Sequence, residues 1–280
     1  MRGLRQKGAR AAMAKTEARK AAKKTAAGRG GAADLPSAIQ QTGNAIAAIL
    51  RLRTVKPATV KKGKAKPAKF EASLAGSAFC IVENRILLTA HHLFNKGKPR
   101  DPKDKFYAFV APQNGPKAYY FPVVGFPFES PDLDMAIIEV GACATAGVKL
   151  AALPVTLETQ PDGSRVLTIG FPAPKITSLS VNQNGDLTGG QFFLKSHANE
   201  GIVSAQYEQA SVDFYELNVG WHHGESGGPI VRLDDPVAAF SLMQLYRNIE
   251  GPHGVVAGPH MGRALKEIEQ ELIAVGASIV

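Results

Sequence analysis

The sequence has few cysteines and no long apolar run. Its 280 residues include two cysteines, Cys80 and Cys143, which is too few for a disulfide scaffold and leaves either two free thiols or one bridge. No segment reaches the roughly 18 apolar residues of a membrane-spanning helix. The longest apolar run near the N-terminus, Ala45–Leu50, is too short and too far into the chain for a secretory signal. We therefore expect no membrane span and a cytoplasmic protein, with an organelle transit peptide as the alternative for an acid-poor start.

Acidic and aromatic residues are scarce in the first quarter of the chain. Residues 1–69 contain 18 Lys and Arg against 2 Asp and Glu, whereas residues 70–280 contain 15 against 22. The formal net charge of +9 therefore combines a net +16 on the basic extension, residues 1–69, with a net −7 on the remainder. We expect this extension to be largely disordered. Within it we predict a short helix over 34–53 and an extended, mobile linker over 55–69.

Two interpretations of the basic extension remain open. It is either a solvated tail or targeting segment, or it attaches the protein to nucleic acid or another polyanion by releasing counterions. No aromatic residue precedes Phe70, so stacking on bases is not supported.

From about Phe70 the sequence changes to short apolar runs separated by turn residues. Runs such as "SAFCIV", "ILLTA", "MAIIEV" and "RVLTIGF" alternate with "ENR", "PDG" and "NQNGD". Many short strands without intervening helices predict an all-β barrel or sandwich. The exception is the segment 260–275, whose apolar residues recur at helical spacing and predict a C-terminal amphipathic helix.

Three motifs carry the chemistry. "GESGGP" places one serine, Ser226, between a carboxylate and two glycines. "ILLTAHHLF" ends an apolar strand just before a pair of histidines, and "SPDLDMAIIEV" places Asp134 directly before another strand. A serine hydroxyl needs a base, and that base needs a carboxylate to fix its tautomer. The chain therefore offers Ser226 a candidate base and an orienting carboxylate, in the order His, Asp, Ser on strand ends.

These motifs resemble those of chymotrypsin-like serine proteases. "GESGGP" is similar to their G-D-S-G-G-P, "LLTAHH" to L-[ST]-A-A-H, and "DMAII" to D-x-A-[LI]-[LI]. "GSAFCI", "VLTIGFP" and "GIVSA" resemble segments of the HtrA (Deg) branch. The resemblance implies an all-β fold of two six-stranded antiparallel β-barrels with a C-terminal helix. It implies a protease domain over 70–280, with a first barrel at about 70–150 and a second at about 151–280. The sequence departs from the HtrA branch in that we expect no PDZ module after the protease domain.

The resemblance also implies a role for each site residue. Ser226 matches the nucleophile, His92 rather than its neighbour matches the base, and Asp134 matches the orienting acid. The backbone N–H groups of Gly224 and Ser226 match the oxyanion hole. Glu225 departs from the Asp or Asn of the family and has no partner identifiable in the sequence.

The substrate is expected to be a protein or peptide. The family pattern places Gly220, His223 and Met243 at the substrate pocket. No carboxylate stands at Gly220, where relatives specific for Arg or Lys carry one, so we expect small or aliphatic residues before the scissile bond.

We expect neither a cofactor nor a metal. His91–His92 and His222–His223 could converge in space, but a zinc site needs three or four ligands. The alternative to a serine endopeptidase is a catalytically silent or latent protease-fold binding module, with or without a tether to nucleic acid through its basic tail. The sequence leaves the oligomeric state open.

Overall fold

The computed structural model describes residues 33–56, 59–61, 64–66, 68–95, 100–111, 117–172, 174–209, 211–220, 222–251 and 254–280. Residues 1–32 of the extension, which is predicted to be largely disordered, lie outside this part of the chain. The mobile linker predicted over 55–69 falls partly within it.

The first unit is a closed six-stranded antiparallel barrel in the strand order β1-β4-β5-β8-β7-β6. Its strands are β1 (Ile46–Lys56), β4 (Lys69–Val82), β5 (Ile86–Ala90), β6 (Asp104–Val110), β7 (Tyr119–Ser130) and β8 (Met135–Val140).

Strand β1 corrects the predicted helix over 34–53. A helix, α2, occupies only Leu35–Gly43, begins at the N-cap Asp34, and is followed by β1 from Ile46. Strand β1 pairs with β4 on one side and β6 on the other, and so closes the barrel. The run Ile46–Leu50 is completely buried, so its apolar residues do not alternate with polar ones as they would in a half-buried strand. The first barrel therefore begins at residue 46 and not near residue 70.

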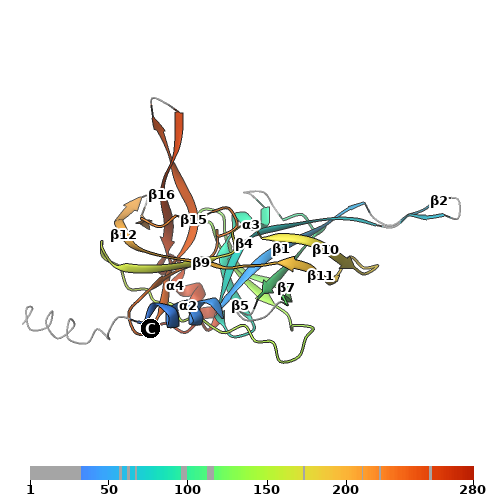
Figure 1. Cartoon of the computed structure of the whole chain (residues 1–280), viewed down its shortest axis with the longest axis horizontal. Coiled ribbons are helices and arrows are strands. Elements are labelled where there is room, and N and C mark those ends of the chain that lie inside the picture. The colour runs from blue at the N-terminus through green and yellow to red at the C-terminus, as the bar shows by residue number, and fades with distance from the viewer. Residues whose placement is uncertain are drawn as a thin grey trace, which may run out of the picture.

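The second unit is also a closed antiparallel barrel, in the order β12-β13-β16-β15-β14-β9. Its strands are β9 (Arg165–Gly170), β12 (His197–Gln209), β13 (Val212–Leu217), β14 (Pro229–Arg232), β15 (Ala238–Gly251) and β16 (Gly254–Ala264). The outer parts of β15 and β16 form a long hairpin that projects from the barrel (Figure 1). Two closed barrels confirm the predicted fold class.

Two further strand pairs lie outside the barrels. The hairpin of β10 (Lys175–Val181) and β11 (Leu187–Phe193) leaves the second unit and contacts the first. The Tyr107 hydroxyl accepts a hydrogen bond from the backbone N–H of Leu187, and Lys105 pairs with Asp186. The short pair β2 (Thr59–Lys61) and β3 (Lys64–Lys66) continues the β1–β4 arm, far from the barrels in Figure 1.

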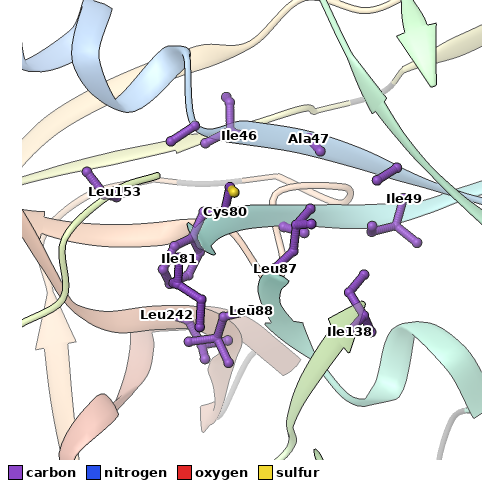
Figure 2. Close-up of a cluster of buried hydrophobic side chains, with 14 of the residues drawn as sticks. Ile46, Ala47, Ile49, Cys80, Ile81, Leu87, Leu88, Ile138, Leu153 and Leu242 are labelled. Carbon is purple, nitrogen blue, oxygen red and sulfur yellow. The ribbon is translucent and has the colours of Figure 1, made fainter. Parts of the chain in front are cut away.

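A hydrophobic core joins the two barrels. Figure 2 shows residues of β1 beside Cys80 and Ile81 of β4, with Leu242 of the second barrel in the same cluster. Both cysteines are free thiols, and burial raises the pKa of Cys80 to about 11.

The C-terminal helix is confirmed but is shorter than the pattern over 260–275 indicates. Strand β16 extends to Ala264, and a 3-10 turn, η1 (Leu265–Ile268), precedes α4 (Glu269–Val275). No helix in the described ranges is long and apolar enough to cross a membrane.

Candidate active site

His92 and Asp134 form a two-point contact in the first barrel. Strand β5 ends at Ala90, and His92 begins the one-turn helix α3 (His92–Asn95). Its Nδ1 lies 2.8 Å from Asp134 Oδ2, and its backbone N–H donates to Asp134 Oδ1 at 2.8 Å. A carboxylate that receives both groups fixes the orientation of the ring and places the proton on Nδ1. The Nε2 atom is thereby left as an acceptor.

Asp134 itself has an unusual backbone. Its φ of +51° lies in the left-handed region, which Asp tolerates better than most residues. Its carbonyl accepts from the His91 N–H at 3.2 Å, while its own N–H donates to the Pro131 carbonyl at 3.2 Å. These contacts turn the chain sharply just before β8 and direct the carboxylate towards His92.

The loop that carries Ser226 packs against the end of β5. A Cβ atom added to Gly227 would overlap Thr89 Oγ1 and would lie only 2.9 Å from the Ala90 N atom, closer than van der Waals contact allows. Gly227 also has a φ of +86°, so both space and conformation require glycine. This approach brings Ser226 to the strand end that presents His92, although the two residues belong to different barrels.

Ser77 of β4 also holds the loop that carries Ser226. Its side chain is fully buried. The hydroxyl donates to the Gly224 carbonyl at 2.7 Å and accepts from the Phe171 N–H at 2.9 Å. Its backbone N–H donates to the Ser226 carbonyl at 2.8 Å. One residue of the first barrel thus holds the backbone on both sides of Glu225.

The backbone N–H groups predicted to form the oxyanion hole are available for hydrogen bonding. Across the described residues, the backbone N–H groups of Gly224 and Ser226 donate to no protein acceptor. Gly224 has a φ of +102°, a conformation that only glycine adopts readily. Both groups are therefore able to donate to a bound molecule.

Ser226 and His92 are not hydrogen-bonded in this structure. Within the described ranges, no hydrogen bond connects the Ser226 hydroxyl with the His92 ring. Catalytic hydrogen bonds are often long in ligand-free enzymes and tighten when substrate binds. The structure therefore makes the His92–Asp134 contact and packs the loop of Ser226 against the end of β5, without a Ser226–His92 hydrogen bond among the described residues.

Glu225 has a partner that the sequence did not reveal. Its carboxylate is buried and accepts from the His222 N–H at 2.5 Å through Oε2. Burial raises the pKa of Glu225, an effect that the His222 N–H bond and the nearby His222 and His197 rings partly offset. The carboxylate thus holds the turn immediately before the serine.

The predicted pocket residues differ in burial. Met243 is fully buried, with its methyl close to Gly228, whereas Gly220 and His223 are exposed. No group of three or more His, Cys, Asp or Glu in the described part of the chain is arranged to hold a metal ion.

Two residues that contact the candidate site, Ser77 and Gln244, were not among the site residues predicted from the sequence. Ser77 lies in the quoted motif "GSAFCI", so its position was visible but its partner was not. Gln244 donates from Nε2 to the carbonyls of Leu133 and Asp134 at 2.7 and 2.8 Å. No local sequence signal links Gln244 to Asp134, because 110 residues separate them.

Comparison with known proteins agrees with this geometry. The sequence profile of the trypsin-like peptidase domain matches residues 76–238, which include His92, Asp134 and Ser226. The chain belongs to the trypsin-like peptidase domain family. The resemblance drawn from the motifs is thereby confirmed at the level of the family.

Solved structures of HtrA-type proteases share the fold. The HtrA-type protease AlgW with a decapeptide matches at a TM-score of 0.57 and 17% identity, over 87% of this chain and 68% of that chain. A variant of AlgW with a decapeptide matches at a TM-score of 0.55 and 16% identity, over 88% and 68%. A comparison with curated proteins finds no match.

Proposed function

We propose that this peptidase-family chain is a serine endopeptidase that uses Ser226, His92 and Asp134. The observation that carries the proposal is the two-point contact between His92 and Asp134, because it leaves Nε2 of the imidazole as a base. The packing of the Ser226 loop against the end of β5 supports it. A decapeptide accompanies the HtrA-type protease AlgW, which supports peptides as the substrate class.

The reaction proceeds through an acyl-enzyme. Ser226 Oγ attacks the peptide carbonyl carbon while His92 Nε2 takes its proton, and the oxyanion accepts from the N–H groups of Gly224 and Ser226. His92 then gives the proton to the leaving amine as the C–N bond breaks. Water, deprotonated by His92, releases the acyl group and restores the serine. One such oxyanion donor contributes roughly 3–4 kcal/mol to the transition state.

A fluorophosphonate probe tests this proposal. Wild-type protein should be labelled on one serine, and labelling should be lost in Ser226→Ala and reduced in His92→Ala. Ser211→Ala is a matched control, because Ser211 is an exposed serine at the β12–β13 turn. Full peptidase activity in Ser226→Ala would overturn the mechanism.

We further propose a preference for small or aliphatic residues before the scissile bond. Gly220 supplies no carboxylate to pair with a basic side chain, and a Cβ at Gly220 would meet no atom within 4 Å. Met243, an apolar side chain, is the buried member of the predicted pocket. A peptide library should be cleaved mainly after Ala, Val or Leu, and cleavage mainly after Arg or Lys would refute the preference.

The open Ser226–His92 contact favours a second candidate, a latent protease-fold module. Such a protein would need a ligand to bring hydroxyl and imidazole together. If the resting state is latent, probe labelling should be slow alone and should accelerate when peptide is added. Labelling at an unchanged, slow rate with and without peptides would favour the silent binding module.

The paired lysines of the β1–β4 arm support polyanion binding as an additional property. Lys56 lies opposite Lys69, and Lys61 opposite Lys64, in the antiparallel register. Like charges opposite one another destabilise a strand pair, and a bound polyanion would relieve that repulsion. Double-stranded DNA should bind in a salt-dependent way and more weakly when Lys56 and Lys69 are both replaced by Gln. Absence of binding at low salt would refute the property.

A further inference from the structure

Gln244 connects the two halves of the candidate site. It follows Met243 on β15 of the second barrel. The Met243 carbonyl accepts from the Gly227 N–H at 2.6 Å, and the Met243 N–H donates to the Gly228 carbonyl at 2.8 Å. The next side chain, Gln244, reaches the first barrel and donates to the Leu133 and Asp134 carbonyls. One dipeptide therefore holds the Ser226 loop through its backbone and the Asp134 corner through a side chain.

The amide of Gln244 has a defined orientation. The side chain is buried, and both contacts are donated by Nε2 to carbonyl oxygens. The opposite orientation would set Oε1 against two acceptors and is excluded. In the observed orientation Oε1 is buried and has no hydrogen-bond partner within the described ranges. A buried unpaired acceptor is costly, so Gln244 is a poor choice for stability alone.

Asp134 is the residue that needs this support. Its left-handed φ of +51° is sparsely populated and persists only where the surroundings fix it. The Gln244 amide and the His91 N–H both donate to the Asp134 carbonyl. These two hydrogen bonds hold the Asp134 backbone in place. Without them the Asp134 Cα could shift, and the carboxylate attached to it would move relative to His92 Nδ1.

We infer that Gln244 is a positioning residue: its amide holds the Asp134 backbone so that the carboxylate faces His92, and couples this orientation to the Ser226 loop. The inference rests on the proposed function for its kinetic consequence. Its structural consequence, the fixed His92–Asp134 contact, does not depend on peptidase activity.

Gln244→Met is the variant that tests the inference. Methionine keeps the length of the side chain, removes both donated hydrogen bonds, and also removes the unpaired Oε1, so the fold should be retained. The control is Gln160→Met, because Gln160 is equally buried and its Nε2 donates to the Glu158 carbonyl. Gln244→Glu is a second variant, which keeps the shape and replaces both donors with an acceptor.

The expected result separates positioning from general destabilisation. In Gln244→Met, kcat and the probe labelling rate should fall roughly 10- to 100-fold, as for a small misplacement of a catalytic group, while KM changes less than about twofold. The low-field proton resonance of the His92 Nδ1–H, visible when the imidazole is held by the carboxylate, should broaden or shift. Gln160→Met should leave both readouts at wild-type values, and Gln244→Glu should be impaired at least as much as Gln244→Met.

Wild-type kcat and an unchanged resonance in both Gln244 variants would overturn the inference. Failure of the proposed function gives a different result, since wild-type protein would then not be labelled at Ser226. The resonance would still report whether Gln244 positions Asp134.

Discussion

Replacing Ser77 with alanine is the most direct test of how the Ser226 loop is held. The hydroxyl makes two buried hydrogen bonds, to the Gly224 carbonyl and from the Phe171 N–H. Alanine leaves both backbone groups without that partner, at a cost of about 1–3 kcal/mol for each. Because the exposed side of the loop can relax partly, we expect a total loss of unfolding free energy of about 3 kcal/mol for the two groups together. For a protein of this size that corresponds to a fall in Tm of roughly 6–12 °C.

Catalysis should be affected as well as stability. Without the Ser77 hydroxyl, the carbonyl of the peptide that follows Gly224 loses its partner, although the N–H of that peptide still donates to the His222 carbonyl. The oxyanion donors on either side of Glu225 are then held less firmly. Loss of one donor lowers kcat by roughly 100- to 1,000-fold, so the rate of fluorophosphonate labelling should fall at least about tenfold. Differential scanning calorimetry and labelling kinetics measure the two effects on the same sample.

Thr168→Val is the matched control for Ser77→Ala. Thr168 is fully buried on β9, but its hydroxyl has no hydrogen-bond partner among the described residues. Removing an unpaired hydroxyl should change stability by less than about 0.5 kcal/mol or increase it, with labelling unchanged. If Ser77→Ala and Thr168→Val gave the same Tm and the same labelling rate, the role assigned to Ser77 would be refuted.

Two further predictions concern the same loop. Gly227→Ala should lose about 3 kcal/mol or more of unfolding free energy in a urea titration, because its Cβ would overlap Ser77 O and its φ is positive. The control is Gly189→Ala, whose Cβ would meet no atom within 4 Å and which should lose less than about 1 kcal/mol. Equal losses in the two variants would contradict the steric argument. Burial raises the pKa of Glu225 above its ordinary 4.5, so its contribution to stability is complete below that value and is lost as pH rises through the raised pKa. The Tm of Glu225→Gln, measured relative to that of wild type, should therefore increase between pH 4 and pH 8. A Tm difference that stays constant across this range would show that the pKa of Glu225 is not raised.

The motifs on strand ends predicted the fold well because their signals are local. The runs before His92 and after Asp134 are continuous apolar strands, and the structure has them as β5 and β8. The roles of His92, Asp134 and Ser226 stay predictions until the probe is applied. The structure adds one observation that the order of the motifs could not give, the contact between His92 and Asp134.

Strand β1 shows where local signals fail. Its first residues, "IAAIL", contain two alanines, and alanine favours helices. A strand buried on both faces has no period of two, and its pattern cannot be distinguished from that of a short helix. The decisive interactions are backbone hydrogen bonds to β4 and β6, which are distant in sequence. Ser77 and Gln244 were missed for the same reason, since 147 and 110 residues separate them from their partners.

The position of β1 determines how the basic extension can be shortened. The charge distribution alone suggests removing residues 1–69. That cut would delete strand β1 from the first barrel and leave the edges of β4 and β6 that pair with β1 without a partner. Unpaired edges of this kind recruit strands from other molecules. A chain that starts at Phe70 should therefore precipitate rather than behave as an isolated catalytic domain, and the safe boundary lies upstream of Ala33, whose N–H donates to the Leu233 carbonyl.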